Sequence, residues 1–305
     1  MKAVIAKEKG SFDSVVVEEV DNPVLKPDEI LVKVYAAGVN PVDWKTVLNG
    51  YFPLPIILGS DIAGIIEAVG KQVKDYRAGD EIIGSLEWQK QSAFAEYVAT
   101  KERYIAPKPK NLSFTEAAGV PLASLTAWQA LFDHAHLQRG EKIVIHAAAG
   151  GVGLFAVQLA KWQGAYVIGT ASERNIDFLK SVGVDELIDY TKYKLTEKVW
   201  NVDAVLDTVG TAEVQEESFK ALKPRGNYVS ITARPREELL EKYEISATRF
   251  LFRSDPAQLK QIVQLIEEEK VKVFIDKTFS LTEARAALEY VHKGRTRGKV
   301  VLTVT

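Results

Sequence analysis

The chain of 305 residues contains no cysteine and only four histidines. Without thiolates, neither a disulfide nor a cysteine-ligated zinc site can form. A catalytic zinc with three protein ligands would need carboxylates together with His134, His136, His146 or His292, which are scattered along the sequence. His134 and His136 stand two residues apart, a spacing that turns two side chains to different sides of a helix. We therefore expect no metal. The absence of cysteine indicates a reducing compartment, the cytoplasm, and a cysteine-free secreted protein is the alternative.

An excess of charge and long apolar runs are also missing. The formal net charge is −2, so no bulk basic field attracts nucleic acid or an anionic membrane. No apolar run has the length of a membrane span. The N-terminal residues MKAVIAKEKGSF alternate apolar and charged side chains, which indicates an edge strand and not a signal peptide. We expect neither nucleic acid nor membrane as a partner.

The composition that is present, 47% hydrophobic and 26% charged, is ordinary for a globular chain of about two domains. In the first hundred residues, β-branched runs punctuated by glycine at 29–40, 61–70 and 80–88 predict a bent β domain. The pattern changes near residue 113. There Ser113, followed three residues later by Glu116, forms a capping box that predicts the start of a helix.

Beyond this point apolar strands alternate with helical segments. The expected strands are residues 142–148, 165–170, 186–189, 203–209 and 227–232. Such alternation is typical of a doubly wound parallel sheet. After residue 254 a helix with one apolar face precedes strands that resemble the N-terminal β region. This order predicts a nucleotide-binding domain, 119–263, inserted between two pieces of a β-rich catalytic domain, 1–118 and 264–305.

The stretch HAAAGGVGLFAVQLA, residues 146–160, lies between the first of these strands and a helix. A dinucleotide-binding loop needs glycine for a tight turn, for approach to the pyrophosphate, and for helix–strand packing. The second and third of these are Gly150 and Gly153, while Ala148 takes the first place, which alanine tolerates at negative φ. A loop that binds nothing is the alternative. The residues expected to hold a cofactor here are Ala149, Gly150, Gly151, Val152 and Gly153.

The end of the second strand distinguishes NAD from NADP. An acidic residue about 20 positions beyond the loop would hold the ribose 2′-hydroxyl. That acid is missing directly after the strand, and Ser172 with Arg174 suits a phosphate instead. Glu173 favours NADH unless its side chain faces away, and a solvated helix start is the plainer alternative. Tyr190, after the third strand, is placed to stack on the adenine side. NADPH is favoured.

At this point the motifs resemble those of a known family, the zinc-free medium-chain dehydrogenase/reductases of the quinone oxidoreductase group. The matching stretches are residues 36–45, 57–70, 79–84, 93–99, 112–131, 146–161, 205–210 and 294–302. The resemblance covers essentially the whole chain, in the right order. It implies an α/β fold in which a GroES-like β-rich catalytic domain is split around an inserted Rossmann domain, with NADPH as cofactor and a homodimer as the assembly.

The resemblance also bears on metal and substrate. Zinc-dependent relatives carry a cysteine and a histidine at two positions that are Asn40 and Ser60 here. The stretch NPVDWK, followed by NGYFPLP, is most similar to the plant-type enone and alkenal reductase branch, which has a lysine, here Lys45, where many bacterial quinone reductases have a tyrosine. The implied function is NADPH-dependent reduction of quinones or α,β-unsaturated carbonyls by hydride transfer without zinc.

Hydride transfer to such a substrate pushes negative charge onto its carbonyl oxygen, and a cation held there stabilises the transition state. We expect Lys45, cationic at neutral pH, to be this partner and Asn40 to be a second polar contact, with water supplying the α-proton. Trp44, Tyr51 and Phe52 are expected to wall a flat pocket.

Plainer interpretations exist for two of these residues, and a neighbour, Asp43, has a structural role. Lys45 could be a solvated lysine at a helix start, and Asn40 a turn residue. Asp43 is expected to cap the helix. The resemblance adds further cofactor contacts, namely Thr126, Val209, Gly210, Ile231, Phe250, Phe252 and Lys299, while Asp207 is expected to end a strand.

Two other functions remain open. An enoyl-thioester reductase should need a basic groove for a pantetheine arm, and no basic cluster stands around residues 45–60. A sensor or structural protein would bind NADPH without turnover.

Overall fold

The computed structural model describes residues 1–87 and 90–304, and these form two compact units. The β-rich unit comprises the described residues within 1–125, 253–269 and 273–304, and the parallel-sheet unit comprises residues 126–252 and 270–272. The units divide after Leu125 and Phe252, whereas the sequence places the boundaries after residues 118 and 263. The segment between 253 and 263 belongs to the β-rich unit, where the Ser254 hydroxyl donates to the Ser85 carbonyl over 2.6 Å.

Antiparallel pairing dominates the β-rich unit. Its strands are β1 (Lys2–Ala6), β2 (Val15–Glu19), β3 (Ile30–Val39), β4 (Ile56–Ile57), β5 (Asp61–Val69), β6 (Glu81–Ser85), β7 (Tyr97–Thr100), β8 (Ile105–Pro107), β15 (Ile275–Ser280) and β16 (Lys299–Thr303). One sheet has the order β2-β1-β4, and the other has the order β15-β16-β3-β5-β6-β8, with β7 also paired to β3. Only the pair β15 and β16, among the described strands of this unit, runs parallel.

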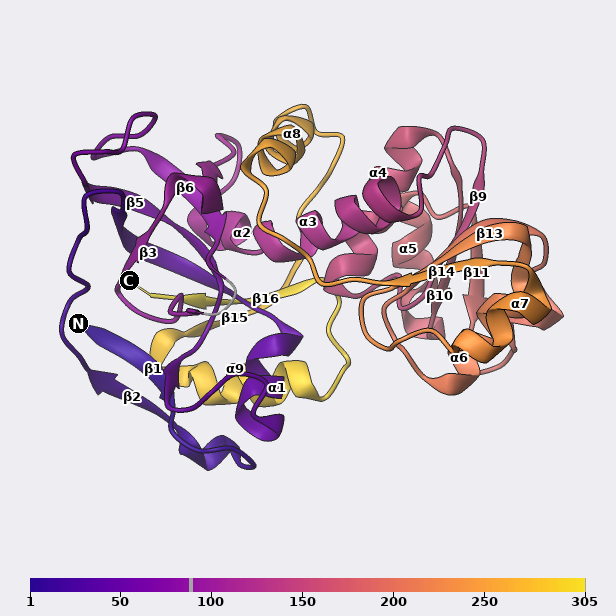
Figure 1. The fold of residues 1–305 in the computed structure, drawn as a ribbon, viewed down its shortest axis with the longest axis horizontal. Coiled ribbons are helices and arrows are strands. Elements are labelled where there is room, and N and C mark those ends of the chain that lie inside the picture. Colours follow the sequence, from indigo (N-terminus) through magenta and orange to yellow (C-terminus); the bar gives the residue numbers. More distant parts are fainter. Residues whose placement is uncertain (88–89, 305) are drawn as a thin grey trace. The chain divides into compact units, whose positions relative to one another are not determined.

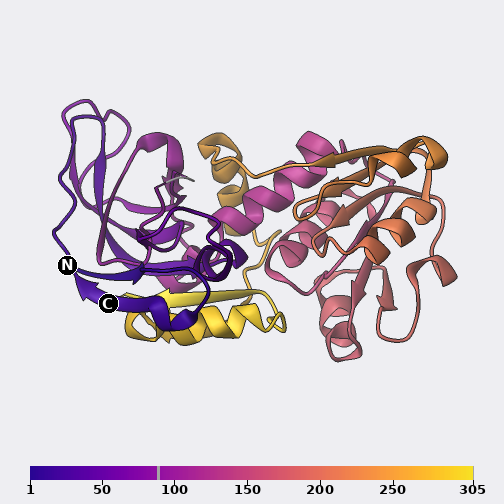
Figure 2. The same cartoon turned by 60° about the horizontal axis from the view of Figure 1, so that its bottom comes forward.

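The last strand of the chain completes the sheet that the first hundred residues begin. Strand β16 runs antiparallel to β3, with Leu302 opposite Ala37. The helices of this unit are α1 (Pro41–Asn49), α2 (Phe114–Ala118), α8 (Pro256–Glu267) and α9 (Ala284–His292), and α3 (Pro121–Trp128) begins in it. In Figure 2 the yellow helix α9 lies beside the indigo N-terminal segment, with which it is in contact. The expected β-rich domain, split by an insertion, is confirmed.

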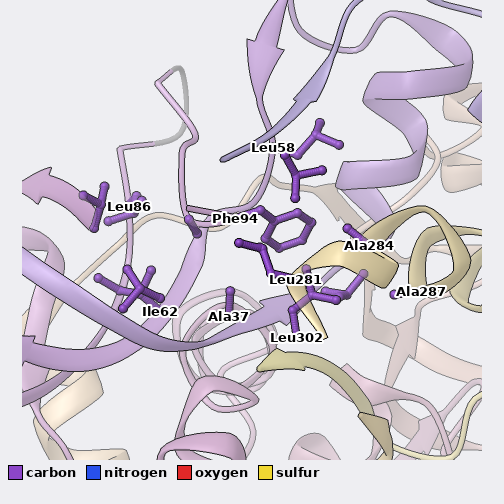
Figure 3. Close-up of a cluster of buried hydrophobic side chains, with 14 of the residues drawn as sticks. Ala37, Leu58, Ile62, Leu86, Phe94, Leu281, Ala284, Ala287 and Leu302 are labelled. Atoms are coloured by element: carbon purple, nitrogen blue, oxygen red, sulfur yellow. The ribbon is translucent and has the colours of Figure 1, made fainter. Parts of the chain in front are cut away.

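The core of the β-rich unit gathers around Phe94, which is fully buried. Figure 3 shows its ring among Leu58, Leu281 and Ala284, which come from both ends of the chain. The ring occupies the space beside Gly59, where a Cβ would lie 2.2 Å from Phe94 Cδ1 and where φ is +88°. Glycine is required there, because any side chain would meet both a steric clash and an unfavourable backbone conformation.

The parallel-sheet unit alternates strands with helices, as the sequence predicts (Figure 1). Its elements are β9 (Lys142–Ile145), α4 (Gly151–Gln163), β10 (Tyr166–Ala171), α5 (Ile176–Val182), β11 (Glu186–Asp189), β12 (Val202–Asp207), α6 (Ala212–Ala221), β13 (Leu222–Ser230), α7 (Leu240–Tyr243) and β14 (Ser246–Arg249). The sheet order is β11-β10-β9-β12-β13-β14, and neighbouring strands run parallel. This is the doubly wound order in which ligands bind at the carboxyl ends of the strands.

The sequence predicts most of these elements but not β14. Its four residues alternate between exposed and half-buried, so they lack the apolar run that marks the other strands. The capping box at α2 is confirmed: Glu116 Oε2 accepts from the Ser113 N–H over 2.9 Å, and Ser113 Oγ accepts from the Glu116 N–H over 3.3 Å. In the part of the chain described, no helix combines the length and the apolar character needed to cross a bilayer.

Replacing Phe94 tests the core of the β-rich unit. We expect Phe94→Ala to lower the free energy of unfolding by ~3–5 kcal/mol, because the lost ring leaves a cavity between segments from both ends of the chain. Chemical denaturation measures this change. The control is Val24→Ala, since Val24 is 84% exposed and its loss should cost less than about 0.5 kcal/mol. Equal losses for the two variants would contradict the assignment of Phe94 to the core.

Candidate cofactor and substrate sites

The glycine-rich loop joins β9 to α4 as the sequence predicts. Gly150 is the N-cap of α4, with φ −76° and ψ 174°, and the helix begins at Gly151. A Cβ at Gly153 would lie 2.4 Å from the Ala147 carbonyl oxygen and 2.8 Å from Ala148 Cα. The third glycine therefore lets the helix pack against the loop. Ala148 is outside the residues with positive φ, so alanine fits the first position.

The amino end of α4 is suited to a phosphate. The first N–H groups of a helix have no partner within it, and the helix dipole adds partial positive charge at that end. A Cβ at Gly150 would meet only the Ala147 carbonyl oxygen, at 3.2 Å, so the loop surface there is open to a ligand. Because Gly151 and Val152 follow as the first residues of the 13-residue helix, the loop residues fit a pyrophosphate.

Residues after β10 and β11 come together, because the two strands are parallel neighbours. Tyr190, directly after β11, donates its N–H to the Ala171 carbonyl at the end of β10 over 3.3 Å, and its side chain is 63% exposed. Ser172 is half-buried and Arg174 is exposed. The adenine-side and phosphate-side residues expected from the sequence therefore lie at one edge of the sheet.

Lys192 lies beside Glu173, the residue whose negative charge argues against NADPH. Its Nζ lies 2.8 Å from Glu173 Oε1, so the carboxylate is paired with a cation. Both side chains are largely exposed, and such a pair is weak, so the ammonium is accessible to a phosphate as well. Sequence reasoning missed Lys192. The signal was its position three residues after the end of β11, beside the expected Tyr190.

Asp207 does more than end β12. It is fully buried, and its Oδ1 accepts from the N–H groups of Val209 and Gly210 over 2.7 and 2.9 Å. The Tyr228 hydroxyl donates to its Oδ2. Gly210 has φ +83°, and a Cβ there would lie 2.3 Å from Thr232 Oγ1, so this tight turn also requires glycine. The carboxylate thus shapes the loop that carries two expected cofactor contacts.

The remaining expected cofactor contacts of the parallel-sheet unit fall into two places. Ile231 follows β13 and Phe250 follows β14, so they lie at the same edge of the sheet as the glycine-rich loop. Phe250 is buried, and its ring centroid lies 4.3 Å from that of His134. Phe252 is half-buried two residues further on. Thr126 is buried on α3.

The expected substrate residues lie on α1 and the loop after it. Lys45 and Trp44 are half-buried, and Lys45 Nζ lies 5.6 Å from the centroid of the Trp44 ring. Gly50 ends the helix with φ +65°. The rings of Tyr51, 41% exposed, and Phe52, buried, follow it with their centroids 5.2 Å apart.

Asn40 is the N-cap of α1 and is 1% exposed. Its Nδ2 donates to Asp61 Oδ2 over 2.9 Å, and its Oδ1 accepts from Lys299 Nζ. The Asn40 N–H donates to Asp43 Oδ2 over 2.7 Å, which confirms the capping role of Asp43. The structure therefore brings Lys299, expected at the cofactor, together with Asn40, expected at the substrate, inside the β-rich unit.

Burial governs the charges of this cluster. It raises the pKa of Asp43 to about 7 and raises that of Asp61, while Lys299 opposes both shifts. Burial lowers the pKa of Lys299, and the two carboxylates oppose it. Ser60 is buried as well, and the described residues contain no group of three histidine or carboxylate side chains arranged to hold a metal.

Family models match both parts of the β-rich unit and much of the inserted unit. The description "Alcohol dehydrogenase GroES-like domain" matches residues 26–110, and "Zinc-binding dehydrogenase" matches residues 182–302. In this chain the second description covers a segment without cysteine.

Individual proteins match the full chain. A 2-methylene-furan-3-one reductase of Solanum lycopersicum is 38% identical over 99% of this chain and 79% of its own. An NADPH-dependent alkenal/one oxidoreductase, chloroplastic, of Arabidopsis thaliana is 35% identical over the same shares. The solved quinone oxidoreductase from Coxiella burnetii is 35% identical, with a TM-score of 0.94 over 100% of this chain and 99% of that one. The chain belongs to the medium-chain dehydrogenase/reductase superfamily, in its quinone oxidoreductase and alkenal/one oxidoreductase branch.

Proposed function

We propose that the protein reduces quinones or α,β-unsaturated carbonyls with NADPH by hydride transfer. One observation carries the proposal: at one edge of the parallel sheet, the amino end of α4 lies beside the cations that follow β10 and β11. The relatives support it, because their names describe an NADPH-dependent alkenal/one oxidoreductase, a furanone reductase and a quinone oxidoreductase.

The residues of the parallel-sheet unit fit the cofactor from end to end. The loop at Gly150 has the open backbone surface that a pyrophosphate needs. Ser172, Arg174 and Lys192 supply a hydroxyl and two cations for the 2′-phosphate, and Tyr190 offers a ring for the adenine. Val209 and Gly210 lie on the loop held by Asp207. When bound, NADPH supplies the hydride.

Lys45 is the proposed partner of the substrate oxygen. Its ammonium, placed on a short helix, would stabilise the negative charge that develops when the β-carbon receives hydride. The aromatic side chains of Trp44, Tyr51 and Phe52 would supply flat apolar walls for a conjugated carbonyl. Asn40 supports this helix from within: its amide is already bonded to Asp61 and Lys299, so we assign it to positioning Lys45. The α-proton comes from water.

Two further expectations stay predictions. A homodimer is proposed from the family resemblance, and β14, at the end of the strand order β11-β10-β9-β12-β13-β14, offers an edge for pairing. A cytoplasmic location is proposed from the cysteine-free composition.

Removing the Lys45 ammonium tests the oxyanion role. We expect Lys45→Met to lower kcat/KM by ~10²–10³-fold on every active substrate, because one preorganised donor at a developing oxyanion is worth about that much. NADPH oxidation with a quinone, a 2-alkenal, a cyclic enone and a crotonyl thioester measures it. The control is Lys71→Met, since Lys71 is exposed in the same unit. A loss below about threefold on every substrate would remove Lys45 from the mechanism, while an unmodified protein inactive on all four would overturn the proposed function.

Two glycines of the same loop should fail in different ways. In Gly150→Ala the Cβ meets one carbonyl oxygen at 3.2 Å. We expect it to keep the Tm and to weaken NADPH binding by about tenfold or more, because the Cβ would occupy the loop surface proposed for the pyrophosphate. In Gly153→Ala the Cβ would lie 2.4 Å from a backbone oxygen, so the Tm itself falls. Thermal unfolding and NADPH fluorescence titration separate the two effects, and unchanged NADPH affinity in Gly150→Ala would argue against the loop as the pyrophosphate site.

Cofactor preference depends on the cations after β10 and β11. We expect Arg174→Ala to raise the Kd for NADPH about tenfold and to leave that for NADH unchanged, because only NADPH carries the 2′-phosphate. Lys192→Ala acts in the same direction. Arg139→Ala, at another exposed arginine of the unit, is the control. Direct titration with both cofactors measures the change. NADH binding as tightly as NADPH to the unmodified protein would reverse the assignment.

A further inference from the structure

A buried histidine stands directly before the glycine-rich loop, and none of the roles above uses it. His146 follows the last residue of β9 and is 4% exposed. Its ring Nδ1 lies 3.1 Å from Thr170 Oγ1 and its Nε2 lies 2.9 Å from Ser218 Oγ. Thr170 is the penultimate residue of strand β10, just before the phosphate-side residues, and Ser218 is on α6. The His146 imidazole therefore links β9 and β10, whose ends lie beside the proposed cofactor site, to helix α6.

The neighbours of His146 determine which ring nitrogen carries the proton. Ser218 donates its hydroxyl to the Val214 carbonyl over 2.6 Å, so its oxygen accepts the proton of Nε2. Nδ1 is then without a proton and accepts from the Thr170 hydroxyl. The same hydroxyl oxygen accepts from the Ala147 N–H over 3.3 Å. The bonds thus run in one direction, from the Ala147 N–H through Thr170 and His146 to Ser218 and Val214.

This chain of bonds needs a neutral ring, and burial supplies it. Burial lowers the pKa of His146 to about 4, while the negative charge of Asp207 works in the opposite direction. An imidazolium would carry a proton on Nδ1 and lose its bond from Thr170. The neutral form with Nε2 protonated is therefore the one that fits all the partners.

The backbone of His146 is bonded to β12 and to the residue that follows it. Its N–H donates to the Leu206 carbonyl over 3.0 Å, and its own carbonyl accepts from the Thr208 hydroxyl over 2.8 Å. Ala147, the next residue, has φ +48°, a left-handed conformation that is unfavourable for a residue with a Cβ. The Ala147 carbonyl is the atom against which Gly153 packs. The bond from the Ala147 N–H to Thr170 thus holds the strained residue on which the loop geometry depends.

We propose that His146 is a positioning residue for the cofactor: as the neutral tautomer protonated on Nε2, it orients the Thr170 hydroxyl, which holds Ala147 and so sets the shape of the glycine-rich loop. The inference rests on the proposed NADPH site. An apolar side chain of similar size would fill the same space but could not accept the Thr170 proton. The hydroxyl would then turn elsewhere and Ala147 would lose this bond, leaving the Ala148 N–H bond to the Thr170 carbonyl as the link between loop and strand.

A pair of substitutions separates the two sides of the ring. Asparagine at 146 places an amide oxygen near the position of Nδ1, whereas glutamine places an amide nitrogen near that of Nε2. We expect His146→Gln to raise the Kd and the KM for NADPH about tenfold, with kcat at saturating NADPH within about twofold, because a lost buried hydrogen bond weakens the loop without touching the reacting atoms. His146→Asn should recover most of the lost affinity. Thr170→Val should match His146→Gln, and the double variant should add little.

Controls distinguish positioning from a purely structural role. Thr303→Val removes a strand hydroxyl of the β-rich unit, bonded to the Phe279 carbonyl over 3.3 Å, and should leave the NADPH affinity unchanged. Nitrogen-15 spectra of the unmodified protein should show His146 protonated on Nε2 alone from pH 8 to pH 5.5. This measurement needs no variant to fold.

Each outcome decides the proposal. It is overturned if His146→Gln and Thr170→Val lower the Tm while the NADPH Kd stays unchanged, if asparagine is no better than glutamine, or if Nδ1 carries the proton. Failure of the unmodified protein to bind NADPH overturns the proposed cofactor itself, and the initial titration shows this before any variant is compared.

Discussion

Buried polar groups must find hydrogen-bond partners inside a protein, and both units of this chain are organised around that constraint. Asp207, buried at the end of β12, accepts two N–H groups of the following loop and one hydroxyl proton. His146 is satisfied by two hydroxyls. In the β-rich unit, Asn40 bridges Asp61 and Lys299. In each case the buried group fixes the backbone beside a candidate site. The shape of that site therefore depends on hydrogen bonds in the interior.

This arrangement places rigidity and chemistry in different residues. The side chains proposed to meet ligands, such as Lys45, Arg174 and Tyr190, are half-buried or exposed, while those that hold their segments are inaccessible. The cost of burying a charge is seen at Asp43, where desolvation raises the pKa of the carboxyl to about 7. The exposed cations are thus available to bind ligands, while buried side chains hold the loops that carry them.

By the resemblance drawn from the sequence, Asn40 and Ser60 occupy the positions at which zinc-dependent relatives carry a cysteine and a histidine. A neutral amide and a hydroxyl are poor ligands for zinc. Here both side chains are buried, and the amide belongs to a hydrogen-bonded cluster with two carboxylates and an ammonium. The proposed function assigns Lys45 as the cation for the developing oxyanion.

The sequence by itself determined the elements whose signals are local. The alternating strands, the capping box at Ser113 and the glycines of the loop follow from residue period and backbone freedom, and all are confirmed. The tertiary structure alone decided what depends on partners distant in the chain. Lys299 meets Asn40 because β16 pairs with β3, and Lys192 meets Glu173 because β11 and β10 are neighbours. His146 likewise acquires its role from residues 24 and 72 positions away. Such partners are set by strand pairing and packing, which no local pattern encodes.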